Sequence, residues 1–273
     1  AVKQFEFQLF AVGLIFVCSA MGIRSVFVLE HSVSFEGERH SGDGQGIYIA
    51  EGCINCHSQY VRDGTLDTEI WGPATLQSGG DDAFLLIGNR RQGPDLSNVG
   101  ARRSREWNRA HLINPELLTA GSRMPSYVHL FERGHTGEGE ALLDYLDTLV
   151  AKDSLEWWNY VLTWNPSVGI DHADLGEGQR SFANSCAQCH GSDGRGEGQA
   201  ASLFANSPRN LVLEPFRFAP DSLDEADRQI RLAQIIKFGI AGTSMPGHES
   251  LTDKEIVDLL AYLESLREDQ TES

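Results

Sequence analysis

Two short stretches decide the fold of this chain: Cys53-Ile-Asn-Cys56-His57 and Cys186-Ala-Gln-Cys189-His190. Both have the pattern C-x-x-C-H, and together they contain four of the five cysteines. Two thiols about one helical turn apart can reach the two vinyl groups of one porphyrin, and the adjacent histidine then lies at the iron. C-x-x-C-H is accordingly the attachment signature of c-type haem. The sequence therefore predicts two covalently bound haem c groups, with His57 and His190 as the proximal iron ligands.

A zinc site and a redox dithiol are the competing interpretations of these motifs. Zinc takes four ligands, and no further cysteine lies near either motif. A thioredoxin-like dithiol lies in a βαβ context, which neither motif has. Two copies of one motif, which use nearly every cysteine of the chain, favour haem.

Composition limits the classes of protein that the 273 residues can form. The net charge of −17 argues against a nucleic-acid-binding protein, because phosphates are bound by a basic surface. A hydrophobic content of 41% is enough for packed cores and makes global disorder improbable. No segment shows a convincing run of strands, and the 28 glycines cluster in loops. We therefore expect an all-α fold, with helices and long loops around each haem.

An apolar stretch near the N-terminus, Leu9 to Leu29, is interrupted only by Arg24. Its length matches the roughly 20 residues of a transmembrane helix. A cleaved signal peptide is the alternative, although Lys3 is the only basic residue before the stretch. We expect a membrane anchor over residues 1–30, in which Cys18 is a small apolar residue. Because c-type haem is attached outside the cytoplasm, we expect a single-pass protein of the bacterial inner membrane, with a cytoplasmic N-terminus and periplasmic haem domains.

The rest of the chain divides into two related units. The predicted segments are a linker (31–42), a first unit (43–150), a Trp-rich bridge (151–170) and a second unit with a short acidic tail (171–273). Each unit has a predicted helix before its C-x-x-C-H motif and ends with a similar amphipathic helix, Ala141 to Leu149 and Asp258 to Leu266. The tryptophans of the bridge favour a fixed assembly with a partner; alternatively they hold the two units to each other.

The sixth iron ligand is predicted from the scarcity of methionine. Of three methionines, Met21 lies in the anchor, and Met124 and Met245 each precede a proline and a terminal helix, one in each unit. Methionine opposite histidine raises the reduction potential of a haem. Packing is the alternative role for both methionines, and bis-histidine ligation is a further one. The candidate histidines are His111, His129, His135 and His248.

Two further features between histidine and methionine suggest contacts to the haems. A ligating histidine normally donates its second ring nitrogen to a carbonyl or carboxylate, and the Pro94 and Pro208 carbonyls are candidate acceptors. Shaping a turn is their alternative role. Arginines also cluster here, and arginine pairs with carboxylates such as haem propionates. The cluster consists of Arg90, Arg91, Arg102, Arg103, Arg105 and Arg109, with Trp107 among them as a possible indole donor.

The first unit resembles a known family. GIYIAEGCINCHSQYVR, RRQGPDLSNVG, REWNRAHLINP and SRMPSY, after an N-terminal anchor, are similar to the membrane-anchored cytochrome c subunit of cbb₃-type haem-copper oxidases over about residues 1 to 130. The motifs of both units resemble the class I cytochrome c fold. The resemblance implies proximal His57, axial Met124 and propionate contacts from Arg91, Arg102 and Trp107. This chain departs from the family, which usually carries one haem, by appending a second class I unit.

The resemblance implies a dihaem electron-transfer subunit with no catalytic residues of its own. Its expected partners are a catalytic haem-copper membrane subunit, a soluble or membrane-bound cytochrome as electron donor, and the lipid bilayer. We expect no nucleic acid. The alternatives are the cytochrome subunit of a nitric oxide reductase, a free-standing anchored dihaem carrier, and a dihaem peroxidase. The acidic second unit would favour a donor with a basic docking face.

Overall fold

The computed structural model describes residues 43–74, 86–88, 90–134, 137–151 and 154–268. Within these ranges the chain is helical, and a bridge between Gly239 and Pro246 is the only β pairing. The predicted all-α class is therefore confirmed for this part of the chain. The predicted anchor (1–30) and linker (31–42) lie outside the described residues. Among the described helices, none combines the length and apolar character that a membrane crossing requires.

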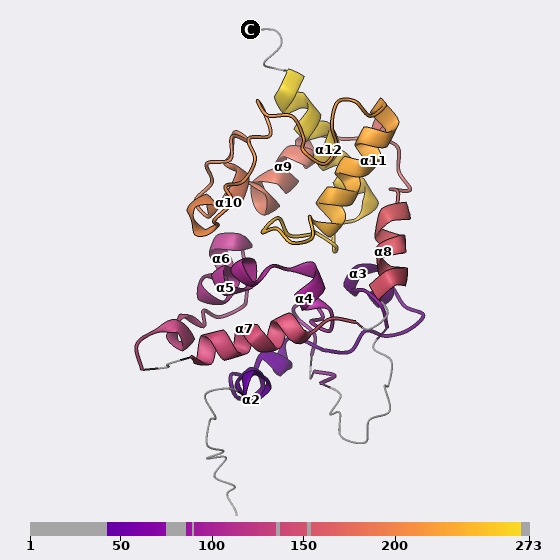
Figure 1. The fold of residues 1–273 in the computed structure, drawn as a ribbon. Coiled ribbons are helices and arrows are strands. Elements are labelled where there is room, and N and C mark those ends of the chain that lie inside the picture. Colours follow the sequence, from indigo (N-terminus) through magenta and orange to yellow (C-terminus); the bar gives the residue numbers. More distant parts are fainter. Residues whose placement is uncertain (1–42, 75–85, 89, 135–136, 152–153, 269–273) are drawn as a thin grey trace, which may run out of the picture. The chain divides into compact units, whose positions relative to one another are not determined.

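The first unit consists of short helices around the first C-x-x-C-H motif (Figure 1). These are α2 (Gly44–Ala50), η1 (Cys53–Asn55), α3 (Asp67–Trp71), α4 (Val99–Arg102), α5 (Arg105–Ile113), α6 (Pro115–Leu118), η2 (Val128–Phe131) and α7 (Glu138–Thr148). Helix α8 (Ser154–Thr163) lies in the bridge. The second unit contains η3 (Ile170–His172), α9 (Leu175–Ser185), α10 (Ala187–His190), η4 (Ala201–Leu203), α11 (Glu225–Phe238) and α12 (Asp253–Glu268).

The first unit is organised by the crossing of its first and last helices, α2 and α7. The helices approach so closely at Gly44 that a Cβ atom there would lie 2.5 Å from Cβ of Tyr145, as well as against the backbone of α7. Tyr48 packs its ring against that of Tyr145, with centroids 5.8 Å apart. The apolar face predicted for α7 is buried, with Leu142 and Leu143 at its centre.

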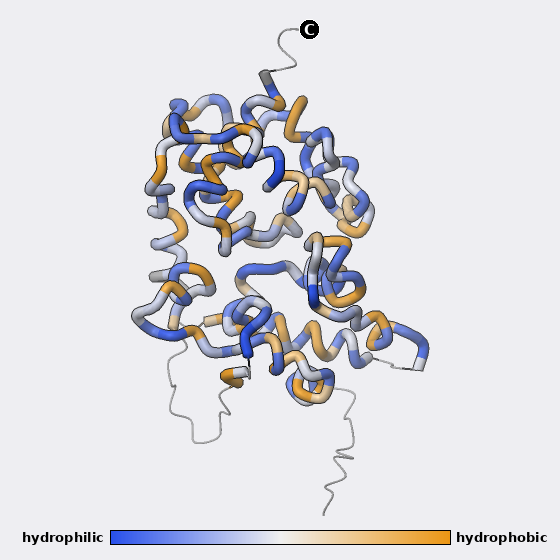
Figure 2. Tube along the Cα trace, turned by 180° about the vertical axis from the view of Figure 1, so that it is seen from behind, coloured by the Kyte–Doolittle hydropathy of each residue, from blue (hydrophilic) through white to orange (hydrophobic). Residues whose placement is uncertain are grey.

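The second unit repeats this crossing with α9 and α12. Gly178 takes the place of Gly44, because a Cβ atom there would lie 2.9 Å from Cβ of Tyr262 and against the α12 backbone. The rings of Phe182 and Tyr262 pack with centroids 5.4 Å apart. Figure 2 shows hydrophobic and hydrophilic residues interspersed along the coiled segments of the chain, as amphipathic helices require. The predicted duplication is therefore present in three dimensions.

The beginning of α12 has a capping box formed by Thr252 and Glu255. The Thr252 hydroxyl accepts a hydrogen bond from the Glu255 amide at 3.3 Å, and the Glu255 carboxylate accepts one from the Thr252 amide at 2.8 Å. Without these two bonds, the amides of Thr252 and Glu255 at the start of the helix would lack hydrogen-bond acceptors. This fixes the start of the helix that forms the second unit's core.

The bridge helix α8 packs its aromatic residues on the second unit. Trp157 and Tyr160 of α8, and Trp164 directly after it, surround Phe238 at the end of α11, with ring centroids 5.5–5.9 Å away and near-perpendicular planes. Edge-to-face contacts of this kind are favourable for aromatic rings. Trp158 lines a small cavity of about 200 Å³, to which Arg102 and Asp147 of the first unit also contribute. The bridge tryptophans therefore hold parts of this chain to each other.

Candidate cofactor-binding site

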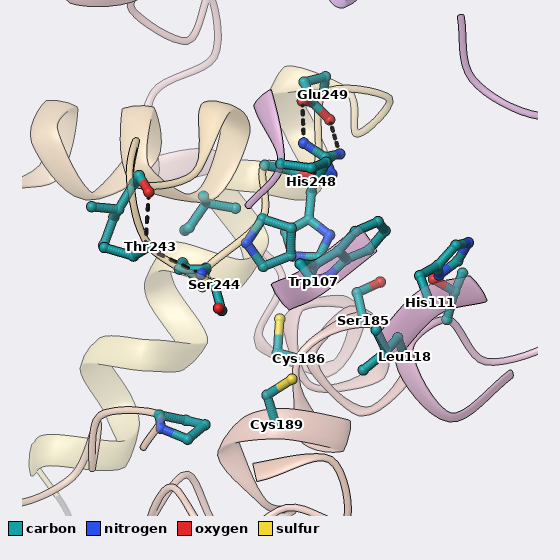
Figure 3. A pocket seen from close by; sticks show the side chains of 18 of the residues that line it. Trp107, His111, Leu118, Ser185, Cys186, Cys189, Thr243, Ser244, His248 and Glu249 are labelled. Atoms are coloured by element: carbon teal, nitrogen blue, oxygen red, sulfur yellow. Dashed lines mark hydrogen bonds and ion pairs between the residues drawn. The ribbon is translucent and has the colours of Figure 1, made fainter. Parts of the chain in front are cut away.

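One cavity of about 1040 Å³ receives both C-x-x-C-H motifs. Both motifs contribute their cysteines and histidine to its lining, as do both predicted methionines. Figure 3 shows the thiols of Cys186 and Cys189 pointing into this cavity, which Trp107 and His111 of α5 also line. The sequence-predicted ligands of the two units are therefore brought together around a single space.

The His57 ring is fixed by the segment around Pro94. Its Nδ1 atom lies 2.8 Å from the Pro94 carbonyl oxygen, so Nδ1 donates to this acceptor. A Cβ atom at Gly93 would lie 2.8 Å from the same nitrogen, so only glycine leaves room for the ring. Burial lowers the pKa of His57, opposed by the Pro94 hydrogen bond and by Asp95. With Nδ1 engaged as a donor, Nε2 is the ring nitrogen that is left for a metal to reach.

His190 has the same arrangement with a different acceptor. Its Nδ1 atom lies 3.0 Å from the carbonyl oxygen of Arg209, so the prediction that Pro208 accepts this hydrogen bond is wrong by one residue. The reason is the packing of the Pro208 carbonyl against Gly196, where a Cβ atom would lie 2.5 Å from it. Pro208 nevertheless lines the cavity. Burial lowers the pKa of His190, and the Arg209 hydrogen bond opposes this effect.

Both methionines are held by the same type of turn. The Ser122 hydroxyl accepts a hydrogen bond from the Met124 amide at 3.2 Å, and the Thr243 hydroxyl accepts one from the Met245 amide at 3.2 Å. Such side-chain-to-backbone bonds fix turns locally. The matching signal in the sequence is a hydroxyl residue two positions before each methionine, which the Met-Pro pattern alone does not include.

The alternative histidine ligands lie in different environments. His129 lies 3.1 Å from a carboxylate oxygen of Glu51 and is not among the residues that line the cavity. His111 and His248 do line it, and burial is the main cause that lowers the pKa of each to about 4. His135 lies outside the described residues. His111 and His248 are therefore the histidines that could compete with methionine.

The cysteines have the environment of buried thiols. The four that the structure describes form no disulfide, and burial raises the pKa of Cys53 to about 11 and that of Cys186 to about 12. A reactive dithiol instead has a lowered pKa. No group of three or more His, Cys, Asp or Glu side chains is gathered as a metal site within the described ranges. The buried thiols and the histidines beside them, gathered around one cavity, fit covalently attached haem c.

The arginines predicted to contact propionates are placed differently from one another. Arg91 forms an ion pair with Asp67 at 2.7 Å and donates to the Ser58 hydroxyl at 2.8 Å. Neither Arg91 nor Arg102 is among the residues that line the cavity, whereas Arg103 and Trp107 are. Of the three positions implied by the resemblance, only Trp107 is therefore brought to the cavity.

Trp107 is the centre of a stack at the cavity wall. The Arg103 guanidinium carbon lies 5.2 Å from the centroid of the Trp107 ring, and the His111 ring stacks on Trp107 with centroids 4.6 Å apart. The cation–π contact keeps the guanidinium at the wall. The sequence pointed to the arginine cluster but could not select Arg103 from its six members.

The sequence resembles proteins of known type. Among curated proteins, it is 27% identical over 243 residues to a nicotinate dehydrogenase subunit from Pseudomonas putida, covering 83% of this chain and 18% of the relative. It is 25% identical over 228 residues to the cytochrome c subunit of the cytochrome bc1 complex from Corynebacterium diphtheriae, covering 83% of this chain and 66% of the relative. The chain thus spans less than two thirds of either relative.

Among solved structures, the chain matches the reducing HAO-like protein complex Kustc0457/Kustc0458 of Kuenenia stuttgartiensis, with a TM-score of 0.28 and 18% identity over 82% of this chain and 95% of that chain. Family models match most of the sequence. Residues 175–267 match the cytochrome c family, and residues 4–149 match the family described as cytochrome c oxidase, mono-heme subunit/FixO. Because the second of these matches covers more than half of the chain, the chain belongs to the FixO family of cytochrome c oxidase subunits, to which it adds a cytochrome c domain.

Proposed function

We propose that this chain is a dihaem electron-transfer subunit of a cbb₃-type cytochrome c oxidase. The observation that carries the proposal is the pair of matching Cys-Cys-His-Met sets that line one cavity. In this proposal residues 1–30 anchor the chain in the bacterial inner membrane, and the two units, 43–150 and 171–273, lie in the periplasm. Membership of the FixO family supports the oxidase assignment, because that family forms a subunit of such complexes.

Each set would hold one haem c, which when bound supplies one-electron redox chemistry. Cys53, Cys56, Cys186 and Cys189 would form the thioether bonds, and His57, Met124, His190 and Met245 would be the axial ligands. The chain's own contribution is positional. The Pro94 and Arg209 carbonyls orient the two imidazoles, and the turns at Ser122 and Thr243 present the two methionines.

The proposed partners follow from the family and from charge. Electrons would reach the chain from a soluble or membrane-bound cytochrome and leave it to the catalytic haem-copper subunit. Similarity to the cytochrome c subunit of a cytochrome bc1 complex also supports a role in respiratory electron transfer. The excess of acidic residues, a net charge of −17, suits a donor with a basic docking face, because opposite charges speed encounter.

The haem count is tested by mass analysis of the holoprotein. We expect the mass of the chain plus two porphyrins, bound covalently through the two motifs. Cys186→Ala combined with Cys189→Ala should remove one haem and leave the other, because each motif attaches its own porphyrin. Cys18→Ala, outside both motifs, is the control and should keep both haems. A wild-type protein with one haem or none would show that the dihaem assignment is wrong.

The oxidase assignment is tested by the composition of the natively purified complex. We expect the chain to co-purify with a haem-copper membrane subunit, and metal analysis of the complex to find copper. Non-haem iron in place of copper would assign the chain to a nitric oxide reductase. Recovery of the chain without any catalytic subunit would instead identify a free-standing carrier.

A further inference from the structure

A buried ion-pair cluster joins the two units next to the cavity. Glu249 follows Met245 in the second unit, yet its two carboxylate oxygens each accept a hydrogen bond from Arg103 of the first unit at 2.8 Å. Arg102 Nη1 donates to the same carboxylate at 3.3 Å. Figure 3 shows Glu249 at the cavity, with its two hydrogen bonds to Arg103 drawn as dashed lines. Two arginines of one unit therefore share one carboxylate of the other.

The cluster is withdrawn from water. The side chains of Glu249, Arg102 and Arg103 are 3%, 5% and 11% exposed. Burial alone would raise the pKa of Glu249, but the charges and hydrogen bonds of Arg103 and Arg102 lower it to about 2. Breaking a buried pair by removing one partner is strongly destabilising, because the remaining charge stays buried and uncompensated. Here the loss of Glu249 would leave two adjacent guanidinium groups without their shared counter-charge.

Further contacts across the same boundary surround the cluster. Arg103 Nη2 donates to the Gly247 carbonyl at 2.9 Å. The Glu106 carboxylate accepts hydrogen bonds from the Ala205 amide at 2.8 Å and from the Ser244 hydroxyl at 2.7 Å. These partners stand directly beside the Met245 turn and the second unit's haem-attachment region. The polar contacts thus join the Met245 turn and the segment around Ala205 to Arg103 and to Glu106 in the first turn of α5.

An apolar cluster lies against the polar one. It is formed by Ala110 and Leu118 of the first unit and by Ala200 and Phe204 of the second, with Trp107 and Cys189 packed on it. Apolar contact of this kind is non-directional. The bidentate pairing of an arginine fork with a carboxylate, by contrast, is specific in direction as well as in distance. The arginine–glutamate cluster is therefore the part of the interface that can select one orientation.

We propose that Glu249 is a positioning residue: its ion pairs with Arg102 and Arg103 hold the second unit in one orientation on the first, so that both ligand sets line one cavity. This inference rests on the proposed function, because it assumes that the two ligand sets hold haem. These bonds do not connect Glu249 to either ligand set. They fix the position of one set relative to the other. Arg102, which the family resemblance implies as a propionate contact, and Arg103 from the same arginine cluster thus join the two units.

Hydrogen–deuterium exchange of the purified full-length holoprotein tests whether Glu249 holds the two units together. The Ala205 amide, bonded to Glu106 across the boundary, is the reporter. We expect Glu249→Gln to speed exchange in the segments around Ala205 and Ser244 by at least about tenfold, because local opening exposes these amides. Helices α9 and α12, inside the second unit, should keep wild-type protection. Circular dichroism in the Soret region should lose any two-signed band that arises from two haems in fixed orientation.

Two matched variants distinguish a loss of contact between the units from a general loss of stability. Glu140→Gln removes a carboxylate that also pairs with two arginines, Arg105 and Arg109, but within the first unit. It should leave exchange at Ala205 unchanged. The double variant Arg103→Glu with Glu249→Arg reverses both charges and keeps their number. It should restore most of the protection from hydrogen exchange at Ala205.

Three results would overturn the proposal. The first is that Glu249→Gln leaves hydrogen exchange at Ala205 unchanged. The second is that it lowers protection in α9 and α12 as much as at Ala205. The third is that the charge-reversed double variant restores no protection at Ala205. The haem count of the same samples is a separate result. If the wild-type protein carries fewer than two haems, the proposed function fails, whereas the exchange comparison still decides whether Glu249 joins the units.

Discussion

Met245→His is expected to lower the reduction potential of one haem and to leave that of the other unchanged. A thioether opposite histidine raises the potential, and a second imidazole removes this effect. Axial ligands span about 0.8 V, and we expect a shift on the order of 0.2 V within that range. Met124→His should have the same effect on the other haem. The measurement is an optically monitored redox titration of the full-length holoprotein.

The remaining methionine supplies the control for this experiment. Met21 lies in the predicted anchor, and Met21→Leu should change neither potential. The oxidised wild-type protein should also show the weak sulfur-to-iron band in the far red, and each Met→His variant should lose half of it. If neither variant shifts a potential, methionine is not the ligand. His111→Ala and His248→Ala would then identify the histidine that is, since both line the cavity.

Gly178→Ala is expected to unfold the second unit at a much lower temperature than in the wild type. A Cβ atom at this position would lie 2.9 Å from Cβ of Tyr262 and against the backbone of α12, which cannot move aside as a flexible side chain can. Overpacking of this kind costs about 3 kcal/mol, which corresponds to a fall in Tm of roughly 12 to 24 °C for a unit of this size. Thermal unfolding followed by circular dichroism measures the effect.

Gly176→Ala is the matched control, since it lies in the same helix on its exposed side. A Cβ atom there would lie 3.3 Å from the Asp174 side chain and 3.8 Å from that of Arg180. We expect a change within about 0.5 kcal/mol, as for most surface substitutions. Equal melting of the two variants would mean that the α9–α12 crossing is not as close as the structure indicates.

The sequence alone predicted the parts of the fold that repeat. The apolar spacing of Leu142 and Leu143, and of Leu259 and Leu260, identified the terminal helices, and all four side chains are buried. The roles of the crossing glycines, Gly44 and Gly178, cannot be predicted from local spacing. They depend on contacts with residues 80 or more positions further along the chain.

The candidate site was predictable where the chemistry requires a particular residue type. The two motifs and the two Met-Pro pairs all line the cavity. Backbone acceptors are less predictable, because any residue has a carbonyl, and the one beside His190 belongs to Arg209 rather than Pro208. Glu249 could not be selected from the sequence. It is one of 39 acidic residues, and only the folded chain brings it to Arg103.

The helical bridge has a consequence for how the second unit is supplied. A short connection keeps two attached modules at an effective concentration in the millimolar range. A contact whose dissociation constant lies well below that concentration is therefore mostly formed within one chain, even if it is too weak to join two separate proteins at micromolar concentration. Because both units belong to one polypeptide, every first unit is made together with its own second unit, in a ratio of one to one. The first unit therefore does not need to bind a separately synthesised carrier protein. Its partner unit is present on the same chain and does not have to reach it by diffusion through solution.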